Sequence, residues 1–439
     1  SSYIVKDRAS LGRPATRFGI EPKEFVYLQM WPKVHILMPI VALALKPGSK
    51  VSQQGSLPVE EIDLDLAPSQ RWTALVNKYR KDIIGRCEHM GKMYRVGLGT
   101  DIAERWVRAA PLDDELRAEY QSIVDAANHP SVTFDCLVLT DMWQAVDSPT
   151  FGCTGMLVAM PNGTVIHGRN IDYDTQKTAM QALRTGAGIG GNLMFDGVFK
   201  QHGKPVAEFI AIAGSLGIHT GMRLGAYSVN SNARLLNNKM MENLRAHEAG
   251  GRNFPWVVRK MLQNVTDFES AVRMMETTEL NAPNYFIFAG SEPYQGAVVT
   301  KDRKGTHEPS TPPVQRLSAS DHIWHLVQTN DDLLSPPEDA RRGTALMRLS
   351  KSQQSLVDMD FVQQEMMSAP VTNSDTLLTW VANARAGTHR VFQRPLEAVG
   401  MGMVSKIMHH AFHIPMPQDL GSSKGSADQG SLRGSPGVE

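Results

Sequence analysis

The sequence is poor in cysteine and balanced in charge, and each of these absences excludes a class of protein. The 439 residues include only three cysteines. Cys87, Cys136 and Cys153 can form at most one internal disulfide and must leave an odd thiol, so the chain is not a disulfide scaffold. Lys plus Arg and Asp plus Glu both number 45, which gives a formal net charge of zero. Because nucleic-acid binding calls for a basic surplus, we expect no nucleic-acid partner.

Long hydrophobic runs and internal repeats are also missing. The most apolar stretch, residues 25–47, is interrupted by Lys33, His35 and Pro39, whereas a membrane span needs about 20 predominantly apolar residues. We therefore predict no spanning helix, and we interpret residues 25–47 as packed core or a pro-segment, with a membrane-surface contact as the alternative. No repeat of about 20 to 50 residues recurs, which excludes solenoids and propellers.

The composition is that of a globular protein, since 42% of the residues are hydrophobic and can bury a substantial core. Residues 1–58 end in a Gly/Ser/Gln linker and are predicted to be an N-terminal extension or pro-segment. Residues 59–152 are predicted to be mostly helical, and residues 153–417 to form the main domain. Residues 418–439 have low complexity and are predicted to be disordered.

Strand-like and helix-like patterns alternate in blocks along the chain. Helices are predicted over residues 70–93, 111–127, 239–279, 337–350 and 353–367, and strands within EEIDLDLAPSQRW (60–72) and over residues 284–302 (a hairpin) and 322–330. Thr266 and Glu269 have the spacing of a helix capping box. This block pattern predicts layered sheets and helices, an α+β fold, and not a βαβ repeat.

Three short motifs carry weak functional signals. GAGIGG (186–191) has glycine spacing like that of a dinucleotide site, but no hydrophobic strand precedes it, so we interpret it as a loop. AGSLG (213–217) lacks the first glycine of a nucleophile elbow. His409 and His413 could share a metal on a helix, but no third ligand lies nearby in the sequence, and a histidine cluster without metal is the favoured interpretation.

The strongest local signal surrounds Cys153. Asn162-Gly163, between two apolar runs, predicts a two-residue hairpin turn. That turn would pair Cys153 directly with Asp172, which would then share its face of the sheet. Arg169 would point to the opposite face, so a bulge or the strand end would have to turn it inward. A buried structural cysteine is the alternative to a reactive one.

The segment CTGMLVAMPNGTVIHGRNIDYD (153–174) resembles the start of the mature catalytic chain in the acid ceramidase and N-acylethanolamine acid amidase family. These enzymes are N-terminal nucleophile hydrolases and share the broader fold of bile salt hydrolases. Further resemblances follow in order along the chain, in IDLDLAPSQRW (62–72), APNYFIFAGSEPYQGAVVTKDRKG (282–305), VQTNDD (327–332) and EDARR (338–342). Together they cover residues 60–395.

The resemblance implies an αββα sandwich of stacked antiparallel sheets flanked by helices. It also implies autocatalytic cleavage between Gly152 and Cys153, which would expose Cys153 as the nucleophile and leave chains of 152 and 287 residues. The other residues that it implies for catalysis are Arg169, Asp172, Asn330 and Arg341, with Asn170 and Asn232 as supporting candidates. We expect Asp172 to bind the new α-ammonium group, and Asn330 to donate its side-chain N–H to the oxyanion.

The resemblance further implies a linear-amide substrate, an N-acylated lipid amine of the ceramide or N-acylethanolamine type. No cofactor or metal is implied, and the compartment would be lysosomal or another part of the endomembrane system. Two departures stand out. Ala233 occupies the position of the family's glutamate in Asn232-Ala233-Arg234, and DSPTFG (147–152) is more turn-like than the family's apolar lead-in. They motivate an alternative, an inactive family member that acts as a binding or structural subunit.

Overall fold

The computed structural model describes residues 56–146, 151–173, 193–304, 313–333, 339–373 and 375–393. All of them belong to one compact unit, Ser52–Glu439. The expectations for residues 25–47, the GAGIGG motif, His409 and His413, and the C-terminal tail lie outside the described residues. The four domain boundaries stay predictions.

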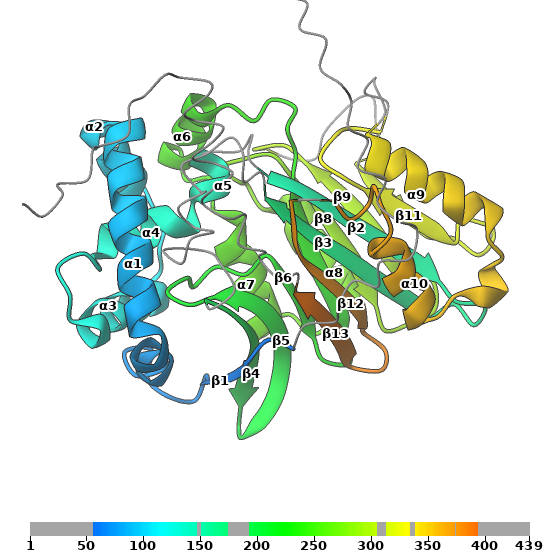
Figure 1. The fold of residues 1–439 in the computed structure, drawn as a ribbon, viewed down its shortest axis with the longest axis horizontal. Helices are drawn as coiled ribbons and strands as arrows, with labels where there is room; N and C mark the ends of the chain where they lie inside the picture. The colour runs from blue at the N-terminus through cyan, green and yellow to red at the C-terminus, as the bar shows by residue number, and fades with distance from the viewer. Residues whose placement is uncertain are drawn as a thin grey trace, which may run out of the picture. The chain divides into compact units, whose positions relative to one another are not determined.

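Two sheets form the centre of the described part (Figure 1). The larger sheet has eight strands in the order β1 (Val59–Asp63), β4 (Met194–Gln201), β5 (Lys204–Ile212), β6 (Thr220–Arg223), β7 (Tyr227–Ala233), β8 (Asn284–Gly290), β9 (Gly296–Lys301) and β10 (Val314–Arg316). The smaller sheet has five, in the order β11 (His325–Gln328), β2 (Phe151–Ala159), β3 (Val165–Tyr173), β12 (Thr376–Asn383) and β13 (Thr388–Gln393). Apart from the parallel pair of β1 with β4, neighbouring strands are antiparallel.

Helices cover the outer face of each sheet. Two helices pack on the five-stranded sheet, namely α9 (Ala340–Lys351) and α10 (Met359–Met366). The others lie on the side of the eight-stranded sheet: α1 (Thr73–Gly97), α2 (Thr100–Arg108), α3 (Asp114–Ala127), α4 (Phe134–Asp141), α5 (Trp143–Val146), α6 (Met240–Glu248), α7 (Phe254–Asn264) and α8 (Phe268–Thr277). The predicted α+β fold with an αββα layer order is thereby confirmed.

Most predicted elements form close to their expected bounds. Helices α1, α3, α9 and α10 and the β8–β9 hairpin all correspond to predicted segments. The predicted capping box at Thr266 is wrong by one residue, because Asp267 is the N-cap of α8 and its carboxylate accepts a hydrogen bond from the Ser270 N–H at 2.8 Å. No helix in the described residues is long and apolar enough to cross a membrane.

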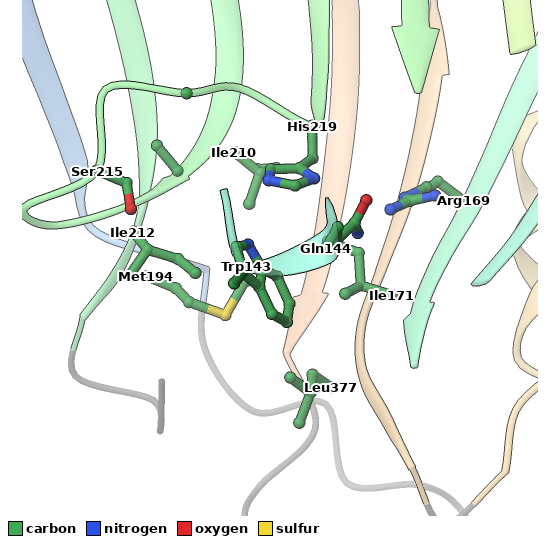
Figure 2. A pocket seen from close by; sticks show the side chains of 12 residues that line it. Trp143, Gln144, Arg169, Ile171, Met194, Ile210, Ile212, Ser215, His219 and Leu377 are labelled. Carbon is green, nitrogen blue, oxygen red and sulfur yellow. The ribbon is translucent and has the colours of Figure 1, made fainter. Parts of the chain in front are cut away.

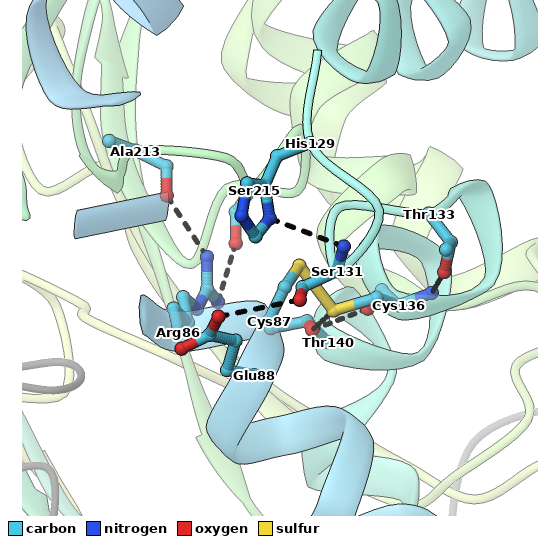
Figure 3. The surroundings of a disulfide bond; sticks show 10 residues. All are labelled: Arg86, Cys87, Glu88, His129, Ser131, Thr133, Cys136, Thr140, Ala213 and Ser215. Atoms are coloured by element: carbon cyan, nitrogen blue, oxygen red, sulfur yellow. Dashed lines mark hydrogen bonds between the residues drawn. A yellow bond between two sulfur atoms is a disulfide. The ribbon is translucent and has the colours of Figure 1, made fainter. Parts of the chain in front are cut away.

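A disulfide between Cys87 in α1 and Cys136 in α4 cross-links two helices of the outer layer (Figure 3). Next to Cys87, the Arg86 guanidinium donates to Ser215 Oγ at 2.9 Å and to Ala213 O at 3.1 Å. Ser215 is therefore a structural residue in the loop between β5 and β6, not a nucleophile on an elbow. Because the chain has three cysteines, the disulfide leaves Cys153 as the free thiol.

A charged cluster links the two sheets at their edge. His389 on β13 contacts Asp196 Oδ2 through Nε2 at 2.7 Å and Glu208 Oε2 through Nδ1 at 2.9 Å. Burial lowers the pKa of His389, but the hydrogen bonds and charges of the two carboxylates outweigh burial and raise the pKa to about 9. The protonated imidazole thus joins β13 to β4 and β5.

This cluster predicts a pH-dependent stability. Because the pKa of His389 is above its unfolded value of about 6.5, its contribution is fully present below pH 6.5 and is lost as the pH rises through about 9. Urea unfolding at pH 6.5 and pH 9.5 should show a larger loss of unfolding free energy for the native chain than for His389→Gln. An equal loss in both proteins would contradict the assignment.

Candidate active site

The register of the β2–β3 hairpin determines which side chains meet. Cys153 pairs with Ile171, and Gly152 pairs with Asp172. The predicted pairing of Cys153 with Asp172 is therefore wrong by one residue. A two-residue turn at Asn162-Gly163 would need an N–H from residue 161, and Pro161 has none.

The turn instead starts one residue earlier. The Met160 N–H donates to Thr164 O, and the Gly163 N–H donates to Met160 O, both at 2.8 Å. Gly163 has a φ of 81°, a conformation that suits glycine. The longer loop shifts every pair in the hairpin by one residue and exchanges the faces of one strand relative to the other.

This shift moves Arg169 to the same face as Cys153. Arg169 pairs with Gly155, two residues beyond Cys153 on β2, and residues two apart on a strand share a face. Asp172 pairs with Gly152 and lies on the other face. The bulge expected to turn Arg169 inward is therefore not needed.

Arg169 faces the eight-stranded sheet and is 1% exposed. Its Nη1 donates to Ser231 O at 2.5 Å and to the side-chain oxygen of Asn232. Asn232 is itself fixed by Asn230 and by the carbonyl of Gln328, at 2.8 Å each. The guanidinium has no carboxylate partner among the described residues. The structure thus brings Arg169 and Asn232 together, as predicted candidates of one site.

Arg341, on the first turn of α9, connects the other predicted residues. Its Nη1 donates to Asp172 Oδ2 at 2.8 Å and to Cys153 O at 3.3 Å, and its Nη2 donates to Asn330 Oδ1 at 3.0 Å. Asp339 holds the same guanidinium through a contact at 2.7 Å. The sequence prediction did not include Asp339, although this residue lies two positions before Arg341 in the quoted EDARR segment.

Asn330 contacts the backbone on both sides of the site. Its Oδ1 accepts the Cys153 N–H at 2.7 Å, and its Nδ2 donates to Ala233 O at 2.8 Å. The expected oxyanion role would require a free side-chain N–H, and one of the two is used by Ala233. The observed contact instead places the amide oxygen against the nitrogen of Cys153.

Asn170 does not join this group. Its Nδ2 donates to Met366 O and Val371 O, and its Oδ1 accepts from Thr379 Oγ1 at 2.8 Å. All these partners lie towards α10 and β12, so Asn170 ties a helix to the sheet. Ala233, at the family's glutamate position, is buried and contributes its carbonyl to Asn330.

The groups around Cys153 shift the pKa of its thiol in opposite directions. Burial raises the pKa of the thiol, the Arg169 and Arg341 charges lower it, and the Asp172 charge raises it, with a net upward shift. The sulfur is therefore a protonated thiol at neutral pH in the uncut chain. Among the described residues, no group of three or more His, Cys, Asp or Glu side chains is placed to hold a metal ion.

A pocket opens on the face that carries Cys153 (Figure 2). The empty space in and around it, open solvent included, is about 630 Å³. The pocket is lined mainly by apolar side chains with a few polar ones among them, and the lining residues are Trp143, Gln144, Arg169, Ile171, Met194, Ile210, Ala211, Ile212, Ser215, Gly217, His219 and Leu377. Ile171 is the cross-strand neighbour of Cys153, so the pocket and the thiol are adjacent.

Buried hydrogen bonds hold one wall of this pocket in place. Asp141, at the end of α4, accepts the N–H groups of Leu216 and Gly217, at 2.8 Å each, and the Tyr120 hydroxyl at 2.5 Å. Together with Arg86, Asp141 fixes the β5–β6 loop that carries His219. Burial lowers the pKa of His219 to about 3, so this side chain is neutral.

Two stacked sheets between helical layers, with a free cysteine at the start of a central hairpin, have the αββα layer order expected of N-terminal nucleophile hydrolases. No family model matches the chain. It is 25% identical to human acid ceramidase over 384 residues, which cover 79% of this chain and 89% of that protein. It is 27% identical to the N-acylethanolamine-hydrolyzing acid amidase of Caenorhabditis elegans over 332 residues, which cover 73% of this chain and 87% of that protein.

A solved structure of the Caenorhabditis elegans amidase ortholog matches with a TM-score of 0.46 and 27% identity, over 53% of this chain and 93% of that chain. The chain is similar in sequence to the acid ceramidases and N-acylethanolamine-hydrolyzing acid amidases over most of its length, and the predicted resemblance is confirmed. Both of these similar proteins are named as hydrolytic enzymes. The prediction that the chain is an amide hydrolase is thereby confirmed.

The charges around Cys153 predict how fast it reacts. Iodoacetamide should alkylate the uncut native chain at pH 7.5 more slowly than the denatured chain, because the thiolate is the reactive form. Arg169→Leu should slow alkylation further, and Asp172→Asn should accelerate it, since the two charges shift the pKa in opposite directions. Intact mass against time measures the rate. Shifts of both variants in the same direction would refute this electrostatic account.

Proposed function

We propose that the chain is the precursor of a cysteine N-terminal nucleophile amidase. Cleavage between Gly152 and Cys153 would activate it, and it would then hydrolyse N-acylated lipid amines, of the ceramide or N-acylethanolamine type, to a fatty acid and an amine. The observation that carries this proposal is the hydrogen bond from the Cys153 N–H to Asn330 Oδ1 at 2.7 Å. The nitrogen that would become the catalytic amine already has a polar partner in the uncut chain.

Cleavage is the step that would create the catalytic base. While Gly152 is attached, the nitrogen of Cys153 is an amide and cannot accept a proton from the thiol. An α-amine has an ordinary pKa of about 7.7 to 8.0, close to that of a thiol. The freed amine could therefore take the thiol proton and later donate it to the leaving amine of the substrate.

The proposed self-cleavage balances without a cofactor. Sγ of Cys153 attacks the carbonyl carbon of Gly152, a C–S bond forms, and the C–N bond to Cys153 breaks as the thiol proton passes to its nitrogen. Water then hydrolyses the thioester, which releases the carboxylate of Gly152 and restores the thiol. Substrate hydrolysis repeats this sequence, with the acyl group of the lipid amide in place of residue 152.

The two arginines support different parts of this reaction. Arg341 holds Asp172 and Asn330 beside the nitrogen of Cys153, so it would position the amine. Arg169 lies on the face of the thiol and of the pocket, so it would stabilise the thiolate and the developing oxyanion. Asp172 would bind the ammonium after Gly152 leaves. The apolar walls of the pocket suit an acyl chain.

Further parts of the proposal follow from the resemblance. We propose a lysosomal or other endomembrane location, and two chains that derive from one precursor. A membrane-surface contact through residues 25–47 stays a proposal, testable by vesicle binding of the chain with and without that segment. The alternative of an inactive subunit has no support, because the relatives are enzymes by name and Arg169, Asp172, Asn330 and Arg341 all assemble around Cys153.

Intact mass tests the activation step. Incubation at mildly acidic pH should split the chain between Gly152 and Cys153 and generate amidase activity, whereas Cys153→Ala should stay whole and inactive because it lacks the nucleophile. Activity is measured as release of fatty acid from a ceramide and an N-acylethanolamine. A wild-type chain that stays whole and releases no fatty acid would refute the proposal.

We predict that cleavage requires glycine at position 152, because any larger residue would place a side chain against Arg341 and Asp172. A Cβ at this position would lie 3.1 Å from Arg341 Nη1 and 3.1 Å from Asp172 Cβ. Gly152→Val should push these side chains away from Cys153 and slow cleavage by about 10²-fold, the scale of a misplacement of about 1 Å. Gly85→Ala is a control, because nothing lies within 4 Å of its added Cβ. Cleavage at the wild-type rate in Gly152→Val would contradict this account.

A further inference from the structure

Two buried polar atoms of residues that line the pocket, one in Arg169 and one in Gln144, have no hydrogen-bond partner among the described residues. Arg169 is 1% exposed and Gln144 is 5% exposed. Within the part of the chain that the structure describes, Arg169 Nε and Gln144 Oε1 make no hydrogen bond, so one donor and one acceptor are left unsatisfied there. Both side chains line the pocket, and in the view of Figure 2 Gln144 is drawn beside Arg169. Native proteins rarely leave such groups unpaired, and a ligand is one explanation.

The pair of groups matches a secondary amide. Such an amide has a carbonyl oxygen that accepts a hydrogen bond and an N–H that donates one. An Arg N–H can only donate and a Gln Oε1 can only accept, so each group of the protein would find its complement in the amide. An ester has the carbonyl but no N–H, and it would leave Gln144 Oε1 unpaired.

The position of Gln144 is set by the fold. It lies on α5, whose Ala145 carbonyl accepts a hydrogen bond from Asn243 Nδ2 at 2.8 Å, so this short helix is anchored to α6. Arg169 is held by Ser231 and Asn232. The guanidinium of Arg169 and the backbone that carries Gln144 are therefore both held in place, which lets the two groups discriminate by geometry. Among the described residues that line the pocket, none carries a carboxylate.

We propose that Gln144 is a specificity-determining residue that, with Arg169, recognises the amide group of the substrate and selects amides over esters of the same acyl chain. This assignment rests on the proposed function for the substrate class. Arg169 would donate to the carbonyl oxygen, and Gln144 would accept the amide N–H. A site built for a hydrogen bond rejects an analogue that lacks the bonding group, because its own buried group then stays unpaired.

Ligand binding to the uncut Cys153→Ala chain tests this assignment without any catalysis. The probes are N-ethyl lauramide and ethyl laurate, which differ only in that the ester has an oxygen atom where the amide has an N–H group. Their dissociation constants are measured by calorimetry. We expect the amide to bind more tightly. Adding Gln144→Met, which keeps the size of the side chain but removes its acceptor, should weaken amide binding by about tenfold or more and leave ester binding within about twofold.

Gln263→Met is the matched control. Gln263 is a buried glutamine on α7 whose Oε1 also lacks a partner, but it does not line the pocket. Its substitution should leave the ratio of amide to ester affinity unchanged. Because the readout is a ratio, partial loss of folded protein affects both ligands alike.

Several outcomes would overturn the assignment. These are equal weakening of amide and ester by Gln144→Met, no change in either, and the absence of binding of both probes to the Cys153→Ala chain. The proposed function can fail separately: a chain that discriminates the two probes but never cleaves itself or releases fatty acid would keep the recognition pair and lose the amidase. Conversely, an active amidase whose Gln144→Met variant keeps the ratio would lose only this inference.

Discussion

Pro161 has no N–H, and that constraint sets the register on which the candidate active site depends. Because residue 161 cannot close a two-residue turn, the hairpin closes through the Met160 N–H, and each pair between β2 and β3 shifts by one residue. The shift places Arg169 on the face of Cys153 and Asp172 on the other face. A hairpin of the other register would bury Arg169 against α9 and α10.

The two faces of this hairpin hold two different environments. On the inner face, between the sheets, Arg169 has only neutral partners, Ser231 O and Asn232, and its charge is not compensated by a carboxylate in the described residues. On the outer face, Arg341 is paired with Asp172 and Asp339. A guanidinium that is compensated serves to position groups, whereas an uncompensated one is available to stabilise a developing anion. This difference gives the two arginines separate proposed roles.

The helical layer on the eight-stranded sheet also serves the pocket. The Cys87–Cys136 disulfide joins α1 to α4, and these helices carry Arg86 and Asp141, which hold the β5–β6 loop through Ser215 and through the N–H groups of Leu216 and Gly217. Trp143 and Gln144 line the same pocket from α5. Residues ahead of Cys153 thus line the same pocket as residues that follow it, so the two chains proposed to result from cleavage would both contribute to the proposed substrate site.

Periodicity along the sequence determined the α+β class and most helices and strands, because it is a local signal. The resemblance of its ordered motifs to a known family supplied the αββα order and the set of polar residues around Cys153. Asp339 and Gln144 lie in or beside recognised segments, but no local pattern distinguishes them from ordinary polar residues. The tertiary structure decided the faces of Arg169 and Asp172, the direction of the Asn330 amide and the unpaired state of Gln144. Each of these depends on a one-residue register or on a partner far away in the chain, such as Asn330 with Cys153, and spacing along the sequence does not encode such contacts.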